Sequence, residues 1–107
     1  MPEVVIAPTS LYLLLAREHV RKDISVCAQN VFDKPNGAFT GEISVAQLKE
    51  ANIEWTLLGH SERRMTLQEK DSFIASKTKA SIDGGLSVIL CCGESLEVSH
   101  EEAGKGL

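Results

Sequence analysis

Four short apolar runs divide the chain, and polar or turn-forming residues follow each of them. The runs begin near residues 4, 24, 55 and 87 and contain many β-branched side chains, which is typical of buried strands. The spacing of apolar residues between the runs predicts helices over 11–21, from Ser44 to about residue 53, and over 69–83. This alternation of strands and helices predicts a parallel sheet with right-handed crossovers.

The apolar spacing also predicts which face of each helix packs on the sheet. These positions are Leu11, Leu14 and Leu15 in the first helix, Val45, Leu48 and Ile53 in the second, and Ile74, Thr78 and Ile82 in the third. We expect Thr9-Ser10 to cap the first helix and Ser44 to cap the second, because short hydroxyl side chains accept hydrogen bonds from free backbone N–H groups. Gly84-Gly85 should end the third helix.

Polar residues gather directly after each predicted strand. These exits are Pro8-Thr9, Gln29-Asn30, His60-Ser61-Glu62 and Gly93-Glu94. In a parallel sheet all of them lie at the carboxyl-terminal edge, where α/β barrels build their active sites. Four strands suit either a small open sheet or part of a closed barrel. We expect the ring of His60 to lie on the face onto which Asn30 and Glu94 open.

The segment from Trp55 to Arg64 carries the strongest candidate chemistry. An apolar strand stops at Gly59, and His60 is the first side chain beyond it. We expect Ser61 to cap the helix that follows. The positive end of that helix disfavours a charged imidazole, so a neutral His60 could donate a hydrogen bond to a substrate oxygen. A histidine satisfied by a turn carbonyl is the alternative interpretation.

Composition and charge narrow the classes of function. The 107 residues allow one domain, and a net charge of −4 argues against nucleic acid or an anionic membrane as the main partner. The three cysteines lie in strand-like segments and are odd in number. They indicate reduced thiols in a cytoplasmic protein rather than a disulfide framework.

Gly59-His60-Ser61-Glu62-Arg63-Arg64 resembles the signature of the triosephosphate isomerase family. Three further segments follow the family's order and spacing: Ala28-Gln29-Asn30, the run from Asn36 to Ser44, and Cys91-Cys92-Gly93-Glu94. The ordered set is far more specific than any one of its members. The resemblance runs from Val4 to about Gly104 and implies an α/β fold, a partial (β/α)8 TIM barrel. Residues 1–107 would form a single partial domain with the second to fifth of its strands.

The resemblance implies interconversion of dihydroxyacetone phosphate and glyceraldehyde 3-phosphate, a step of glycolysis and gluconeogenesis, without a cofactor or a metal. His60 would polarise the substrate carbonyl, and its neutral state at a helix N-terminus is a known feature of the family rather than an independent prediction. Ser61 would hold the glutamate base at rest, Cys91 would pack beside that base, and Glu62 would be a buried acid paired with a lysine. The base, that lysine and the phosphate loops are absent from this sequence.

The same resemblance implies a homodimer formed through residues 36–42. Thr40 would reach toward the partner's active site, and Glu42 would pair with the partner's counterpart of Arg63. Glu69 would tie down Arg63 within the subunit. Without the family, this segment would be a long surface loop and Glu62-Arg63-Arg64 a solvated charge cluster.

Two alternatives stand beside the enzyme. One is a catalytically inactive half-barrel fragment that acts only as a scaffold or association module. The other is a metal-dependent hydrolase that uses His60 and Cys91. A zinc site of His60, Cys91 and Cys92 is the weaker hypothesis, because neighbouring cysteines point to opposite faces of a regular strand.

Overall fold

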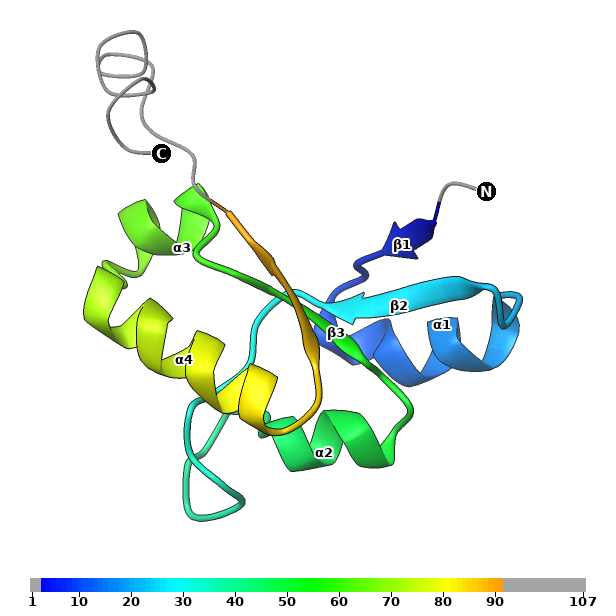
Figure 1. Cartoon of the computed structure of the whole chain (residues 1–107), viewed down its shortest axis with the longest axis horizontal. Helices are drawn as coiled ribbons and strands as arrows, with labels where there is room; N and C mark the ends of the chain where they lie inside the picture. Colours follow the sequence, from blue (N-terminus) through cyan, green and yellow to red (C-terminus); the bar gives the residue numbers. More distant parts are fainter. Residues whose placement is uncertain (1–2, 92–107) are drawn as a thin grey trace, which may run out of the picture.

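A computed structural model describes residues 3–91 and contains one parallel sheet (Figure 1). Its strands are β1 (Val4–Ile6), β2 (Ile24–Ala28), β3 (Trp55–Leu58) and β4 (Ser87–Leu90). They are hydrogen-bonded in the order β1-β2-β3-β4, and every pair is parallel. The structure therefore confirms the predicted α/β half-barrel, with the strand exits at one edge of the sheet.

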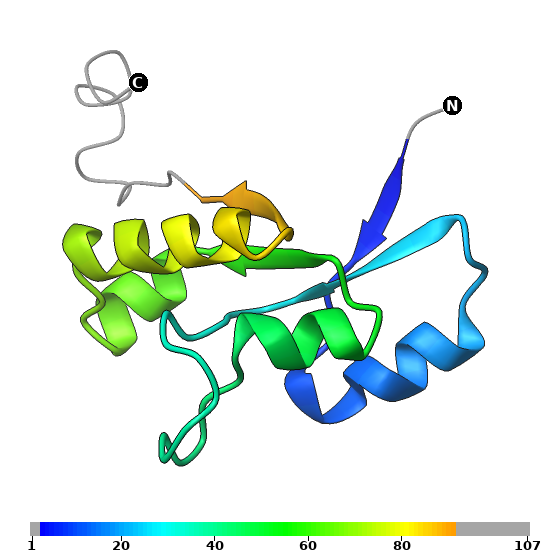
Figure 2. The same cartoon turned by 60° about the horizontal axis from the view of Figure 1, so that its bottom comes forward.

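Helices connect the strands. They are the 3-10 turn η1 (Ser10–Tyr12), α1 (Leu13–His19), α2 (Val45–Glu50), α3 (Ser61–Thr66) and α4 (Asp71–Asp83). The three predicted helices correspond to α1, α2 and α4, and each is shorter than expected. Residues 31–43 form a long loop that projects away from the sheet before α2 (Figure 2).

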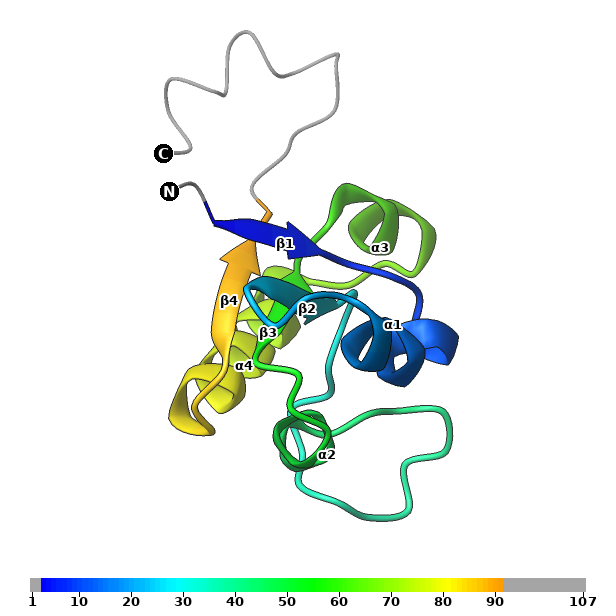
Figure 3. The same cartoon turned by 90° about the vertical axis from the view of Figure 1, so that its right-hand side faces the viewer.

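One face of the sheet packs on the helices and forms the core. Val26 and Ala28 of β2 and Leu58 of β3 are buried there against Leu13 and Leu48 of the helices. Side chains alternate along a strand, so the intervening residues of each strand face the other way. These residues are Val5 of β1, Ser25 and Cys27 of β2, Trp55 and Leu57 of β3, and Ser87 and Ile89 of β4. Figure 3 shows β1 and β4 steeply crossed, the twist of a sheet that curls toward a barrel.

The predicted packing face of the first helix is wrong. Leu13 is buried, and Ala16 and Val20 pack against the core, whereas Leu11, Leu14 and Leu15 are exposed. The segment begins as a 3-10 turn without a side-chain cap from Thr9, so it does not keep the α-helical phase assumed from residue 11. A run of leucines offers several possible stripes, and periodicity alone could not choose between them.

The packing face of α4 also differs from the prediction. Ile74 is buried as expected, but Ile82 is 60% exposed. The buried positions after Ile74 are Lys77 and Ser81. A lysine occupies the core-facing stripe because its ammonium meets polar partners there, as described below.

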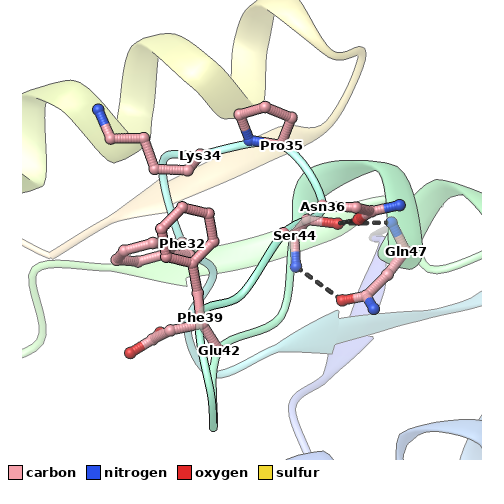
Figure 4. A pocket seen from close by; sticks show the side chains of 9 residues that line it. Phe32, Lys34, Pro35, Asn36, Phe39, Glu42, Ser44 and Gln47 are labelled. Atoms are coloured by element: carbon pink, nitrogen blue, oxygen red, sulfur yellow. Dashed lines mark hydrogen bonds between the residues drawn. The ribbon is translucent and has the colours of Figure 1, made fainter.

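The capping of α2 is confirmed and anchors the base of the long loop. The Ser44 hydroxyl accepts a hydrogen bond from the Gln47 N–H at 3.1 Å, and the Gln47 side chain accepts one from the Ser44 N–H at 2.9 Å. Asn36 reaches back from the loop to the Ser44 hydroxyl (Figure 4). Gly85, at φ +90°, follows α4 and confirms the predicted glycine stop.

The sheet face opposite the helices predicts self-association of the isolated chain. Most of its residues are apolar, and Trp55, Leu57 and Ile89 are half-buried, whereas parallel sheets are normally covered on both faces. We expect Ile89→Lys to reduce association, because a charge on this face opposes its burial against another copy. Light scattering across a concentration series measures the effect, with Ala75→Lys on the exposed side of α4 as the control. A single sharp unfolding transition of a monomeric wild-type chain would contradict the expectation.

Candidate active site

Gly59 directs the chain sharply out of β3. Its φ of +75° lies in the left-handed region that favours glycine. A Cβ at this position would also lie 3.2 Å from the carbonyl oxygen of Cys91 and 3.3 Å from a methyl carbon of Ile74. Both constraints require glycine, so the residue that follows stands at the carboxyl end of the strand.

His60 is that residue, and it caps α3 with its own side chain. Its Nδ1 accepts a hydrogen bond from the Glu62 N–H at 3.1 Å. The predicted N-cap, Ser61, is therefore wrong: Ser61 is the first helical residue, one position too late to cap. Because Nδ1 is an acceptor, the neutral imidazole carries its proton on Nε2.

His60 lines a cavity of about 310 Å³ together with Gln29, Leu57, Glu62 and Arg63. The cavity lies beyond β2 and β3, on the side to which Leu57 points. Gln29 also donates a hydrogen bond to the carbonyl of Ala7 at 2.9 Å, which ties the exits of β1 and β2 together. We expected the ring of His60 to lie on the face onto which Asn30 and Glu94 open. This prediction is wrong for Asn30, whose side chain accepts a hydrogen bond from Lys77 instead. Glu94 lies outside the described residues.

A buried charge cluster lies behind the His60 helix. Glu69, whose side chain is 5% exposed, accepts hydrogen bonds from Arg63 Nε at 3.0 Å and Lys77 Nζ at 2.6 Å. Burial raises the pKa of Glu69, but the hydrogen bonds and positive charges of Lys77 and Arg63 outweigh it and hold the pKa below its ordinary value. Glu69 is therefore a carboxylate that joins α3 to α4.

Comparison with known proteins decides the family. The family described as Triosephosphate isomerase matches residues 2–106. The chain belongs to this family.

Similar members come from several fungi. The triosephosphate isomerase of Emericella nidulans is 69% identical over 103 residues, that of Paracoccidioides lutzii 64% over 103 residues, and that of Yarrowia lipolytica 55% over 106 residues. The matches cover 96% to 98% of this chain and 41% to 42% of those proteins. The chain thus spans about two fifths of the length of its triosephosphate isomerase relatives.

Glu62 differs from the buried acid that the triosephosphate isomerase resemblance implies. Its side chain is 86% exposed, and its Oε1 lies 3.5 Å from Nδ1 of His60. The first turn of α3 points it into solvent, and the lysine expected to draw it inward is not in this sequence. The structure therefore brings Glu62 to the cavity without burying it.

The cysteines of this triosephosphate isomerase segment are free thiols where they are described. Cys27 is buried, Cys91 is half-buried after β4, and Cys92 lies outside the described residues. Burial, with a smaller contribution from Cys91, raises the pKa of the Cys27 thiol to about 11. Within residues 3–91 no three histidine, cysteine or carboxylate side chains form a metal-binding group, and no helix is long and apolar enough to cross a membrane.

The loop of residues 36–42 does not line the His60 cavity. Thr40 and Glu42 are exposed on it, and Phe39 packs on Phe32 with ring centroids 5.1 Å apart. Arg63 and Glu42 contribute to a second cavity, of about 250 Å³, near the exit of β2.

Lys77, in the charge cluster around Glu69, is a residue that the sequence analysis did not predict. Its spacing from Ile74 and Ser81 on one helix face was the available signal.

Gly59→Ala tests the turn that presents His60. We expect a loss of roughly 1–3 kcal/mol in the free energy of unfolding, because alanine disfavours the positive φ and its Cβ crowds Cys91 and Ile74. Gly41→Ala is the control, since Gly41 has φ +88° and nothing within 4 Å of a Cβ. Urea denaturation measures both. Equal losses for the two variants would show that the crowding at Gly59 has no cost.

Proposed function

We propose that this chain forms the part of a triosephosphate isomerase that carries the electrophilic histidine. The reaction interconverts dihydroxyacetone phosphate and glyceraldehyde 3-phosphate by proton transfer through an enediol(ate), without a cofactor. The observation that carries the proposal is the hydrogen bond from Glu62 N–H to His60 Nδ1, which leaves a proton on Nε2 at the edge of a cavity. Family membership supplies the reaction.

The chemistry requires a base beside the substrate carbonyl and a donor that stabilises charge on its oxygen. His60 is the donor, since its Nε2–H can bond the carbonyl oxygen and strengthen that bond as negative charge grows. The base and the phosphate-binding loops belong to parts of the family barrel beyond this chain. Ser61 and Cys91 would contact that base, and Glu62 would complete the polar rim of the cavity.

An inactive scaffold is the less favoured alternative. The three fungal relatives are all named as triosephosphate isomerases, and the chain matches them over nearly its whole length. The apolar face of the sheet fits a piece of a closed barrel. A glycolytic role and a cytoplasmic location belong to the same proposal.

A chimeric enzyme tests the role of His60. In it, this chain replaces the matching segment of the Emericella nidulans relative, which supplies the rest of the barrel. We expect isomerisation of glyceraldehyde 3-phosphate in a coupled assay, and a fall in kcat of about 10²-fold or more for His60→Gln, as for loss of an oxyanion donor. His19→Gln, at the exposed end of α1, is the matched control. A folded chimera without turnover, or full activity of His60→Gln, would refute the assignment.

We also propose that residues 36–42 form a homodimer contact. Thr40 and Glu42 are exposed on a projecting loop whose base is fixed by the capping box of α2. Arg63 stays partly exposed beside a cavity and can receive a carboxylate from a second subunit. In this arrangement Glu42 pairs with Arg63 of the partner subunit.

Glu42→Gln in the same chimera tests this contact. We expect the dimer dissociation constant to rise by about tenfold, or 1.4 kcal/mol, because one partner of an interfacial charge pair is neutralised. Glu50→Gln, at the exposed end of α2, controls for the change in net charge. Sedimentation equilibrium measures both constants, and identical values for the two variants would exclude the pairing.

A further inference from the structure

Lys77 is a buried cation that the proposed chemistry does not use. It lies in the middle of α4 and is 1% exposed. Its Nζ lies 2.9 Å from Oδ1 of Asn30, 2.6 Å from Oε2 of Glu69 and 4.3 Å from the ring centroid of Phe73. An ammonium removed from water needs such partners; here Asn30 follows β2, Glu69 lies just before α4, and Phe73 is on α4 itself.

Two of these partners lead to the His60 site. Asn30 follows Gln29, which lines the same cavity as His60. Glu69 holds the side chain of Arg63 at 3.0 Å, and its own N–H donates to the Arg63 carbonyl at 3.3 Å. The Arg63 N–H in turn donates to the carbonyl of His60 at 2.9 Å, within the first turn of α3. Lys77 is therefore linked to two residues that line the cavity: to Gln29 through Asn30, and to Arg63 through Glu69.

The third partner leads to the projecting loop. Phe73 packs edge-on against Phe32, with ring centroids 6.1 Å apart, and Phe32 packs on Phe39. The lysine thus ends a row of aromatic rings that starts at the loop of residues 36–42.

We propose that Lys77 is a positioning residue that fixes the His60 imidazole relative to the exit of β2 and to the loop of residues 36–42. The inference rests on the proposed role of His60. Without the ammonium, Glu69 keeps one cationic partner and remains almost fully buried. A buried carboxylate in that state protonates or draws in water, which loosens its hold on Arg63 and on the first turn of α3.

The test uses the chimeric enzyme described above, labelled with 15N in backbone and histidine. The readouts are the imidazole 15N shifts of His60 and the 1H shift of the Glu62 amide that donates to it. We expect Lys77→Met to move these signals, because the imidazole loses its fixed orientation, and Lys77→Arg to restore them toward the wild-type positions. Lys79→Met is the matched control, since Lys79 lies on the same helix but is exposed and pairs with Asp83. Its His60 signals should not move.

Unchanged His60 and Glu62 signals in a cooperatively unfolding Lys77→Met variant would overturn the proposal. If that variant does not unfold cooperatively, Glu69→Gln decides: we expect it to move the same signals, and their constancy would overturn the proposal equally. Neither readout depends on turnover. A failure here therefore leaves the isomerase assignment untouched, and an inactive chimera leaves this positioning role untouched.

Discussion

The burial of a single sheet face constrains the rest of the molecule. Alternate side chains of four parallel strands pack on the helices, so the strands keep one register and their exits meet at one edge. Gln29 and His60 come from different strands and share a cavity only because of this register. The other sheet face is set by the same alternation, and its apolar residues are what a closed barrel would cover.

Charge burial is the second constraint and acts locally. Glu69 remains ionised in the core because Arg63 and Lys77 both donate to one of its oxygens. These bonds join α3 to α4, while the backbone of α3 continues from the histidine that caps it. Packing positions the strands, and this cluster positions the short helix that packing alone would hold weakly, since none of its residues is fully buried.

Much of the fold could be predicted because its signals are local. The β-branched runs, the Ser44 cap and the glycine stop after α4 act through near neighbours in the chain. The sequence predicted all three, and the structure confirms them. The candidate site residues were predicted from an ordered set of motifs, and His60 also from its place directly after β3. The family match supports that ordering, while the individual roles of Ser61, Glu62 and Cys91 remain predictions.

The failures have a common cause in tertiary context. The buried face of α1 depends on a 3-10 turn that leucine spacing does not encode. The N-cap of α3 is His60 rather than the predicted Ser61, because an imidazole nitrogen can accept the capping hydrogen bond one residue earlier. Lys77 occupies a core position because its hydrogen-bond partners, Glu69 and Asn30, lie 8 and 47 residues away and outside α4.

The buried thiol of Cys27 has a consequence for chemical reactivity. With a pKa of about 11, only about one molecule in ten thousand carries the thiolate at neutral pH. Alkylating agents and peroxide attack thiolates, so this cysteine is protected both by its surroundings and by its protonation. Cys91, half-buried at the end of β4, is then the more accessible of the two for a reporter group beside the site.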